Sequence, residues 1–253
     1  MSSSRESLRV AIIYSSPRTY GNSRRVSEFL AEIFRMNLVE TRIFNVYEMK
    51  IEPCLGCVSD DVRLCVFPCV IEDDARELFE YLDKSHGFVI VSPIYWYSVP
   101  GPLKNLIDRM TVFENAIFTE GRSRLEGKVF GVVVVGSDTG SIAVIQNLMS
   151  IMNSMGVVIP PWALAYYAGE GDPFEDEKFL LDLGNLARSV VEMIKILRET
   201  DGYRKTWYDA SSEFIERLRE IAKTVNRMIS ESESSRMKTR LELIRRQLTK
   251  IKR

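Results

Sequence analysis

Residues 8–14 read LRVAIIY, and residues 15–36 follow as SSPRTYGNSRRVSEFLAEIFRM. The first stretch is a continuous apolar run rich in β-branched residues, which is typical of a strand buried on both faces of a parallel sheet. In the second stretch a polar loop precedes a helix, for which Asn22 or Ser23 is a suitable N-cap. The opening of the chain therefore predicts a strand, a loop and a helix.

The same alternation continues through the first two thirds of the chain. Residues 39–46, 87–92, 129–135 and 157–159 have strand character. Helices are expected to open at the acidic residues 72–74, at Gly101 and Pro102, and over about 142–155. Strands that alternate with helices predict an α/β protein with a right-handed, doubly wound parallel sheet of five strands, in the order 2-1-3-4-5.

Strand signals stop after Gly171. Residues 175–197 and 212–229 are helical by periodicity, and apolar residues continue at spacings of three and four up to Ile251. The polar residues 231–235 (ESESS) are expected to break the last helix into two, as a helical hairpin or an oligomer contact. We therefore predict one domain over residues 1–170 and a helical extension over residues 171–253 that serves oligomerisation.

The charge of the chain is unevenly distributed. The formal net charge is −1, but residues 236–253 contain eight basic residues and one acidic residue. We interpret this tail as the solvated face of an interface helix, and a nucleic acid or an acidic membrane is the less favoured partner. The longest apolar run, 129–135, is too short to cross a bilayer, and the first residues do not form a secretory signal. We expect a cytoplasmic protein that does not enter the membrane.

Three unusual loops follow the strands whose carboxyl ends should meet at the ligand-binding edge of the sheet. Residues 15–23 offer hydroxyls, one arginine, a glycine and a helix N-terminus, which suit a phosphate monoester. The spaced glycines of dinucleotide sites and the P-loop pattern are absent from this loop. Residues 92–101 place three aromatic residues between two prolines, and residues 136–140 are small and polar. A phosphate site, an aromatic wall and a small polar loop together predict a site for flavin mononucleotide (FMN).

These loops resemble those of a known family. Ser16-Pro17-Arg18 with Gly21-Asn22-Ser23, and the run from Ser92 through Arg109, are similar to the phosphate and isoalloxazine loops of the NAD(P)H-dependent FMN reductases. That group is flavodoxin-like and includes the iron-sulfur flavoproteins and relatives that lack a cluster. The resemblance covers roughly residues 8–161 and implies a flavodoxin-like fold.

The resemblance also implies which residues contact the flavin. The phosphate would be bound by Ser16, Arg18, Asn22 and Ser23. The ring and ribityl chain would be contacted by Pro93, Ile94, Tyr95, Trp96, Tyr97 and Ser98, and the third loop would close over the ring with Ser137, Asp138, Thr139 and Gly140. The chemistry then belongs mainly to the cofactor, and no catalytic side chain is predicted.

Further polar residues near these loops are given structural roles. We interpret Lys104, Asn105, Asp108 and Arg109 as residues that anchor the helix after the aromatic loop. His86, which comes just before the third predicted strand, is interpreted as a capping or surface residue.

All four cysteines of the chain lie in one window: Cys54, Cys57, Cys65 and Cys69. In the iron-sulfur flavoproteins a compact four-cysteine motif follows the second strand, and both ends of this window resemble it. The middle departs from the motif, because the third cysteine of the family falls near Asp60 and Cys65 comes later. Four thiolates could hold a four-iron four-sulfur cluster or zinc, and the cysteines could instead form disulfides or stay free thiols.

We therefore predict an FMN-dependent oxidoreductase that passes electrons from NAD(P)H through the flavin to an unknown acceptor, with the cysteines as a candidate iron-sulfur site. A cluster-free NAD(P)H-dependent flavin or quinone reductase and a non-enzymatic electron carrier are the competing hypotheses. A homodimer or homotetramer is expected, since flavodoxin-like reductases of this type often place the flavin near a subunit interface.

Overall fold

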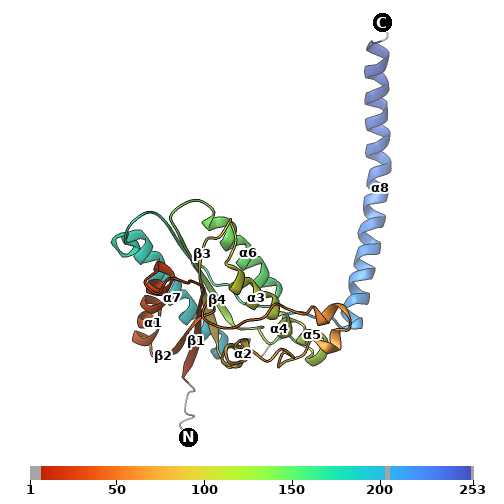
Figure 1. The fold of residues 1–253 in the computed structure, drawn as a ribbon. Coiled ribbons are helices and arrows are strands. Elements are labelled where there is room, and N and C mark those ends of the chain that lie inside the picture. Colours follow the sequence, from red (N-terminus) through yellow and green to blue (C-terminus); the bar gives the residue numbers. More distant parts are fainter. Residues whose placement is uncertain (1–6, 203–205, 252–253) are drawn as a thin grey trace. The chain divides into compact units, whose positions relative to one another are not determined.

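The computed structural model describes residues 7–202 and 206–251, with backbone only for residues 231–236 and 251. Contacts divide the chain into two units, with the boundary after Trp207. The first unit is built on a five-stranded parallel sheet in the order β2-β1-β3-β4-β5 (Figure 1). The predicted class, strand number and strand order are confirmed.

The first three strands agree with the sequence pattern. They are β1 (Leu8–Tyr14), β2 (Val39–Asn45) and β3 (Gly87–Pro93), and β1 pairs in parallel with both of the others. Residues Val10 to Ile13 of β1 are fully buried. This is the burial expected of a central strand that is covered on both faces.

The other edge of the sheet corrects one prediction. Strand β4 (Val129–Gly136) pairs with β5 (Leu164–Ala168), whereas residues 157–159 had been predicted as the fifth strand. Val158 forms only an isolated bridge to Val129. Pro160 and Pro161 then end the strand pairing, because proline lacks the N–H that a strand ladder needs.

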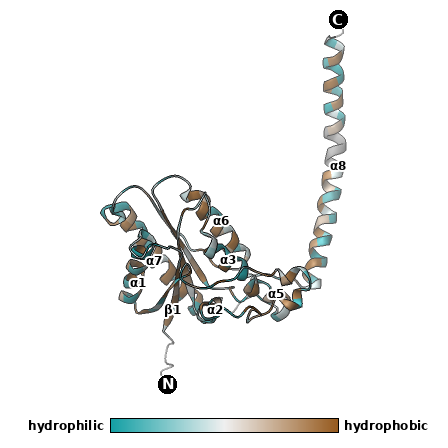
Figure 2. Cartoon of the chain, viewed as in Figure 1, coloured by the Kyte–Doolittle hydropathy of each residue, from teal (hydrophilic) through white to brown (hydrophobic). Residues whose placement is uncertain are grey.

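Helices cover both faces of the sheet. One core lies under α2 (Ala75–Asp83), α3 (Gly101–Arg109) and α6 (Ser141–Ser154), and the other lies under α1 (Asn22–Met36) and α7 (Glu177–Glu199). Short helices α4 (Thr111–Glu114) and α5 (Ala116–Glu120) follow α3, and the 3-10 turns η1 (Cys57–Ser59), η2 (Val62–Leu64) and η3 (Pro173–Glu175) lie in loops. The apolar residues concentrate on the strands and the inner helix faces (Figure 2).

The burial of helix α7 places the domain boundary later in the chain than predicted. Its side chains at Leu183, Leu186 and Val190 are fully buried in the core shared with α1 and β4. The predicted boundary at residue 170 is therefore wrong, because α7 completes one face of the sheet and belongs to the first unit.

The second unit consists mainly of α8 (Ser212–Ile251), a single helix of 40 residues. The expected break at residues 231–235 is absent from its backbone, so the predicted helical hairpin is not formed. Serine and glutamate are compatible with a helix, and without glycine or proline the backbone has no obligatory stop there. No helix in the described part of the chain is both long and apolar enough to cross a membrane.

Candidate functional site

A cavity of about 610 Å³ lies at the carboxyl ends of the strands. It is lined by the loops after β1, β3, β4 and β5, and it brings together most of the predicted flavin residues. Ser16, Arg18, Asn22 and Ser23 line it, as do Pro93 to Tyr97 and Ser137 to Thr139. The sequence thus placed three loops correctly around one site.

The loop after β1 is shaped for a small anion. The Ser16 hydroxyl accepts a hydrogen bond from the backbone N–H of Arg18 (3.2 Å), and the Gly21 N–H bonds to the Arg18 carbonyl (3.1 Å). A Cβ on Gly21 would lie 3.1 Å from the Arg18 Cβ and 3.3 Å from the Ser16 Oγ. The loop therefore forms a tight turn that leads directly into the start of α1.

The N-cap residue of α1 differs from the prediction. Its N-cap is Gly21, with no side-chain hydrogen bond, so neither Asn22 nor Ser23 caps the helix. A helix terminus without a side-chain cap leaves N–H donors for an anion. In addition, the buried hydroxyl of Ser15 has no hydrogen-bond partner in the described structure.

Two arginines near this terminus have different partners. Arg25 donates to both carboxylate oxygens of Asp172 (2.8 and 2.7 Å), and its guanidinium lies 4.9 Å from the centre of the Phe174 ring. Arg18 is exposed, and no acidic side chain among the described residues pairs with it. Arg18 is thus the cation available to a phosphate in this loop.

The aromatic loop after β3 is a strained turn. Tyr95 and Ser98 exchange two backbone hydrogen bonds, of 2.9 and 3.0 Å. The residues between them, Trp96 and Tyr97, have φ values of 50° and 61°. Positive φ at both central positions defines a type I′ turn, which glycine and asparagine ordinarily occupy. Bulky residues held in this conformation indicate a functional constraint.

The turn projects its aromatic side chains outward. Trp96 is 95% exposed, and Tyr97 is 61% exposed. The loop after β4 packs against this turn, because Gly136 and Gly140 leave room for it. A Cβ on Gly140 would come within 2.8 Å of the Tyr97 ring, and one on Gly136 within 2.7 Å of Ile94.

The prediction of the lining residues was incomplete. Gly169, Glu170 and Gly171, after β5, line the cavity but were not predicted, because the fifth strand had been misplaced. Their signal was the small-residue sequence AGEG directly after an alternating strand. Conversely, Ser98 and Gly140 do not line the cavity: Ser98 closes the aromatic turn, and Gly140 precedes α6.

A second cavity, of about 330 Å³, holds the cysteines. All four line it, with apolar neighbours such as Leu64 and Val112, and all four are free thiols. They come from the excursion between β2 and α2, in which η1 contacts η2 and η2 contacts α5. The fully buried Asn115 holds this excursion by donating to the carbonyls of Val62 and Cys65 (both 2.7 Å).

The thiols influence one another electrostatically. Burial, and to a lesser extent the neighbouring Cys54, Cys69, Cys57 and Glu114, together raise the pKa of Cys65 to about 11. The Cys65 thiol therefore needs a positive group beside it before it ionises near neutral pH.

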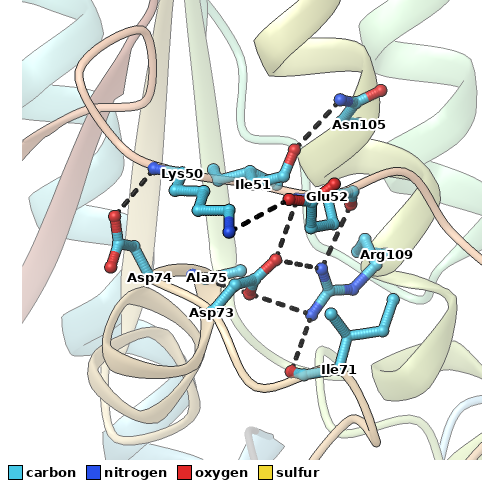
Figure 3. Close-up of polar contacts among 9 residues, drawn as sticks. All are labelled: Lys50, Ile51, Glu52, Ile71, Asp73, Asp74, Ala75, Asn105 and Arg109. Atoms are coloured by element: carbon cyan, nitrogen blue, oxygen red, sulfur yellow. Dashed lines mark hydrogen bonds and ion pairs between the residues drawn. The ribbon is translucent and has the colours of Figure 1, made fainter.

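Arg109 closes the cysteine segment at both ends (Figure 3). Its Nη1 donates to the Glu52 carbonyl (3.2 Å) and to Asp73 (2.7 Å), and its Nη2 donates to the Ile71 carbonyl (3.3 Å) and to Asp73 (3.2 Å). Asp73 also accepts from the backbone of Glu52 (2.8 Å). The side chains of the pair are 1% and 2% exposed.

The remaining residues interpreted as structural have contacts of that kind. Asn105 donates to the Ile51 carbonyl (3.1 Å), and Lys104 pairs with Asp108 one turn later on the exposed face of α3. His86 exchanges hydrogen bonds with the backbone of Arg9 through its Nδ1 and its own N–H (3.1 and 2.8 Å). His86 lines neither cavity of this site.

Comparisons with known proteins agree with this geometry. Residues 8–169 match the family model described as NADPH-dependent FMN reductase. An iron-sulfur flavoprotein of Methanocaldococcus jannaschii is 27% identical over 76% of this chain and 100% of its own length. An iron-sulfur flavoprotein of Archaeoglobus fulgidus is 30% identical over 72% of this chain and 95% of its own length.

Among solved structures, RosB with a bound flavin intermediate, 8-demethyl-8-formylriboflavin-5'-phosphate, has the same fold. Its TM-score is 0.67 at 15% identity, over 86% of this chain and 87% of that one. The fold, the matched residues and the relatives together show that this chain belongs to the NADPH-dependent FMN reductase family of flavodoxin-like oxidoreductases.

Proposed function

We propose that this protein is an FMN-dependent oxidoreductase that takes electrons from NAD(P)H and passes them to an acceptor by way of an iron-sulfur cluster. The observation that carries the proposal is the pairing of two cavities. Helix α3 begins after the aromatic loop of the strand-end cavity and ends at Arg109, which lines the cysteine cavity. Nine helical residues span only about 13 Å at roughly 1.5 Å per residue.

The strand-end cavity fits FMN. The open terminus of α1, the exposed cation of Arg18 and the hydroxyls of Ser16 and Ser23 suit its phosphate. The Tyr95–Ser98 turn and the loop from Ser137 supply an aromatic surface and a close backbone approach for its ring. The chemistry that bound flavin supplies is acceptance of a hydride and release of electrons to an acceptor.

We favour a cluster over a single zinc ion at the cysteine cavity. Among the described residues, no three cysteine, histidine or acidic side chains converge closely enough to hold a single metal ion. The four thiols instead surround a cavity, which favours a group of several atoms. Cys54, Cys57, Cys65 and Cys69 would be the ligands, and the group would supply one-electron transfer.

The residues of the chain would position the reactants rather than move protons. Trp96 and Tyr97, held outward by the turn, would form the wall against which a nicotinamide ring approaches the flavin. In flavin and nicotinamide chemistry the hydride would move directly between the two rings, so no side chain is needed as a base.

The test is an absorption spectrum with iron, sulfide and zinc analysis of protein purified without oxygen. A flavin spectrum with about four irons per chain is expected from the cysteine count. Flavin without iron would leave the cluster-free reductase, and failure to bind added FMN would overturn the proposal.

Turnover distinguishes the enzyme from an electron carrier. With an artificial acceptor and either NADH or NADPH, the enzyme should oxidise the nucleotide continuously. A carrier would bind FMN firmly and show no turnover with either nucleotide.

A further inference from the structure

Arg109 has one donor that the buried ion pair does not use. Its terminal nitrogens make all four of the hydrogen bonds described above, while its Nε has no hydrogen-bond partner among the residues that the structure describes. The residue is 2% exposed, so water does not reach that nitrogen in place of a protein acceptor. An N–H in this state costs free energy unless something accepts it.

The unused donor belongs to a residue of the cysteine cavity. Arg109 lines this cavity together with Cys69, and it is the only cation among the lining residues. Although burial acts to lower the pKa of Arg109, hydrogen bonding to Asp73 and the neighbouring Cys69 raises it. Cys69 is also close in sequence to Ile71, whose carbonyl Arg109 holds.

We propose that Arg109 is a positioning residue of the cysteine site that offers its Nε hydrogen to the sulfur of Cys69. Its terminal nitrogens meanwhile fix both ends of the cysteine segment to α3. The inference rests on the proposed function, because the sulfur needs this donor when it is a negatively charged ligand. A hydrogen bond to a ligand sulfur stabilises the more negative, reduced form of a cluster and so raises its reduction potential.

The Arg109→Lys variant separates this role from simple anchoring. Lysine keeps a positive charge for Asp73, but it has no donor at the Nε position of the guanidinium. We expect the purified variant to retain iron and to show a cluster reduction potential more negative than that of the wild type. The potential is read from the cluster absorption during an anaerobic redox titration, which does not depend on turnover.

Two further variants make the result interpretable. Asp73→Asn weakens the same ion pair while leaving Nε intact, and removing the negative charge should move the potential in the positive direction. Lys104→Met removes an exposed cation from the same helix, where it pairs with Asp108, and should leave the potential unchanged. Equal shifts in Arg109→Lys and Asp73→Asn, each with a lower melting temperature, would show an anchoring role only and overturn the inference.

A second substitution covers the case in which Arg109→Lys does not fold. The double variant Arg109→Met with Asp73→Asn removes both charges, so no carboxylate is left buried alone, and the side-chain oxygen of the asparagine can still accept from the backbone N–H of Glu52. It should show the same negative shift as Arg109→Lys. An unchanged potential in either folded variant would overturn the role of Arg109, whereas wild-type protein without iron would overturn the proposed function as well.

Discussion

At the scale of single residues, we propose that Arg18 holds the FMN phosphate. We expect Arg18→Ala to weaken FMN binding about 10- to 100-fold, since a charge-assisted hydrogen bond contributes about 1.5–3 kcal/mol. Titration of the apoprotein with FMN, followed by flavin fluorescence, measures the change. Arg24→Ala is the matched control, because Arg24 lies in the first turn of α1, pairs with Glu28 and does not line the cavity. Equal affinity in the wild type and Arg18→Ala would place the phosphate elsewhere.

Lys128 is buried at the end of the sheet opposite the functional loops. It makes the free energy of unfolding depend on pH in an unusual way. Burial lowers its pKa to about 8, and its Nζ donates to the carbonyls of Asp83 and Ser85 (both 2.7 Å). Above pH 8 the native lysine loses its proton, while the unfolded chain keeps its own up to about pH 10.5. The unfolded state then binds more protons, so this residue makes stability rise with pH across that window.

Comparison with Lys128→Met isolates this effect. The variant leaves two carbonyls without a donor and should be less stable at all pH values. The difference in unfolding free energy between wild type and variant should nevertheless grow from pH 7.5 to pH 9.5, as measured by urea denaturation. A difference that stays constant with pH would contradict the shifted pKa.

Some residues of the site could be predicted and others could not, for local reasons. Hydroxyls, an arginine and aromatics after strands are visible in the sequence, because they are unusual there. The cap of α1 was not predictable, because Asn22 and Ser23 are both good capping residues and only the closed Gly21 turn excludes them. The donors of Arg109 depend on carbonyls at Glu52 and Ile71, which no side-chain pattern reveals.

At the scale of elements, the Tyr95–Ser98 turn stores strain that can be measured. We expect Trp96→Gly to be more stable than Trp96→Ala by about 0.5–1 kcal/mol, because alanine retains the penalty of positive φ and glycine does not. Both variants lose the same exposed ring, so packing largely cancels in the comparison. Urea denaturation of the two apoproteins measures the difference. Equal stability would mean that the turn relaxes once the ring is removed.

The strands show where sequence periodicity succeeds and where it fails. Strands β1, β3 and β4 are buried on both faces, so continuous apolar runs identified them. Strand β5 lies at the edge with alternating exposure, and Leu164 and Tyr166 remain 37% and 40% exposed. Its pattern was therefore weaker than the apolar run 157–159, which pairs at a single residue only.

At the scale of the whole molecule, α8 exposes apolar side chains along its length. These large apolar side chains stay about half exposed, for example Leu218 at 47% and Leu248 at 54%. A lone helix of this length gains little stability unless an apolar face is covered. The exposed apolar face of α8 supports the oligomerisation that the sequence predicts for this region.

The apolar residues of α8 also have a symmetric spacing. Four pairs lie at equal distances on either side of residue 233: Leu218 and Leu248, Ala222 and Ile244, Val225 and Leu241, and Ile229 and Met237. Because α8 is one continuous helix, its two halves do not reach each other within a copy. Each half can find its counterpart in an antiparallel second copy. That arrangement also keeps apart the basic C-terminal halves, which would repel in a parallel pair.

Deletion of α8 tests this assembly directly. A chain ending at Trp207 keeps every residue of both cavities, since contacts place these in the first unit. We expect it to bind FMN, and to contain fewer chains per particle than the full-length protein, as calculated from the molar mass by light scattering after size-exclusion chromatography. Leu218→Glu with Leu241→Glu in the full chain should have the same effect, because two carboxylates would be buried in the apolar contact. The matched control, Glu216→Gln with Arg245→Gln, changes exposed polar residues and should leave the mass unchanged. Full-length protein that is monomeric at micromolar concentration would contradict self-association through α8.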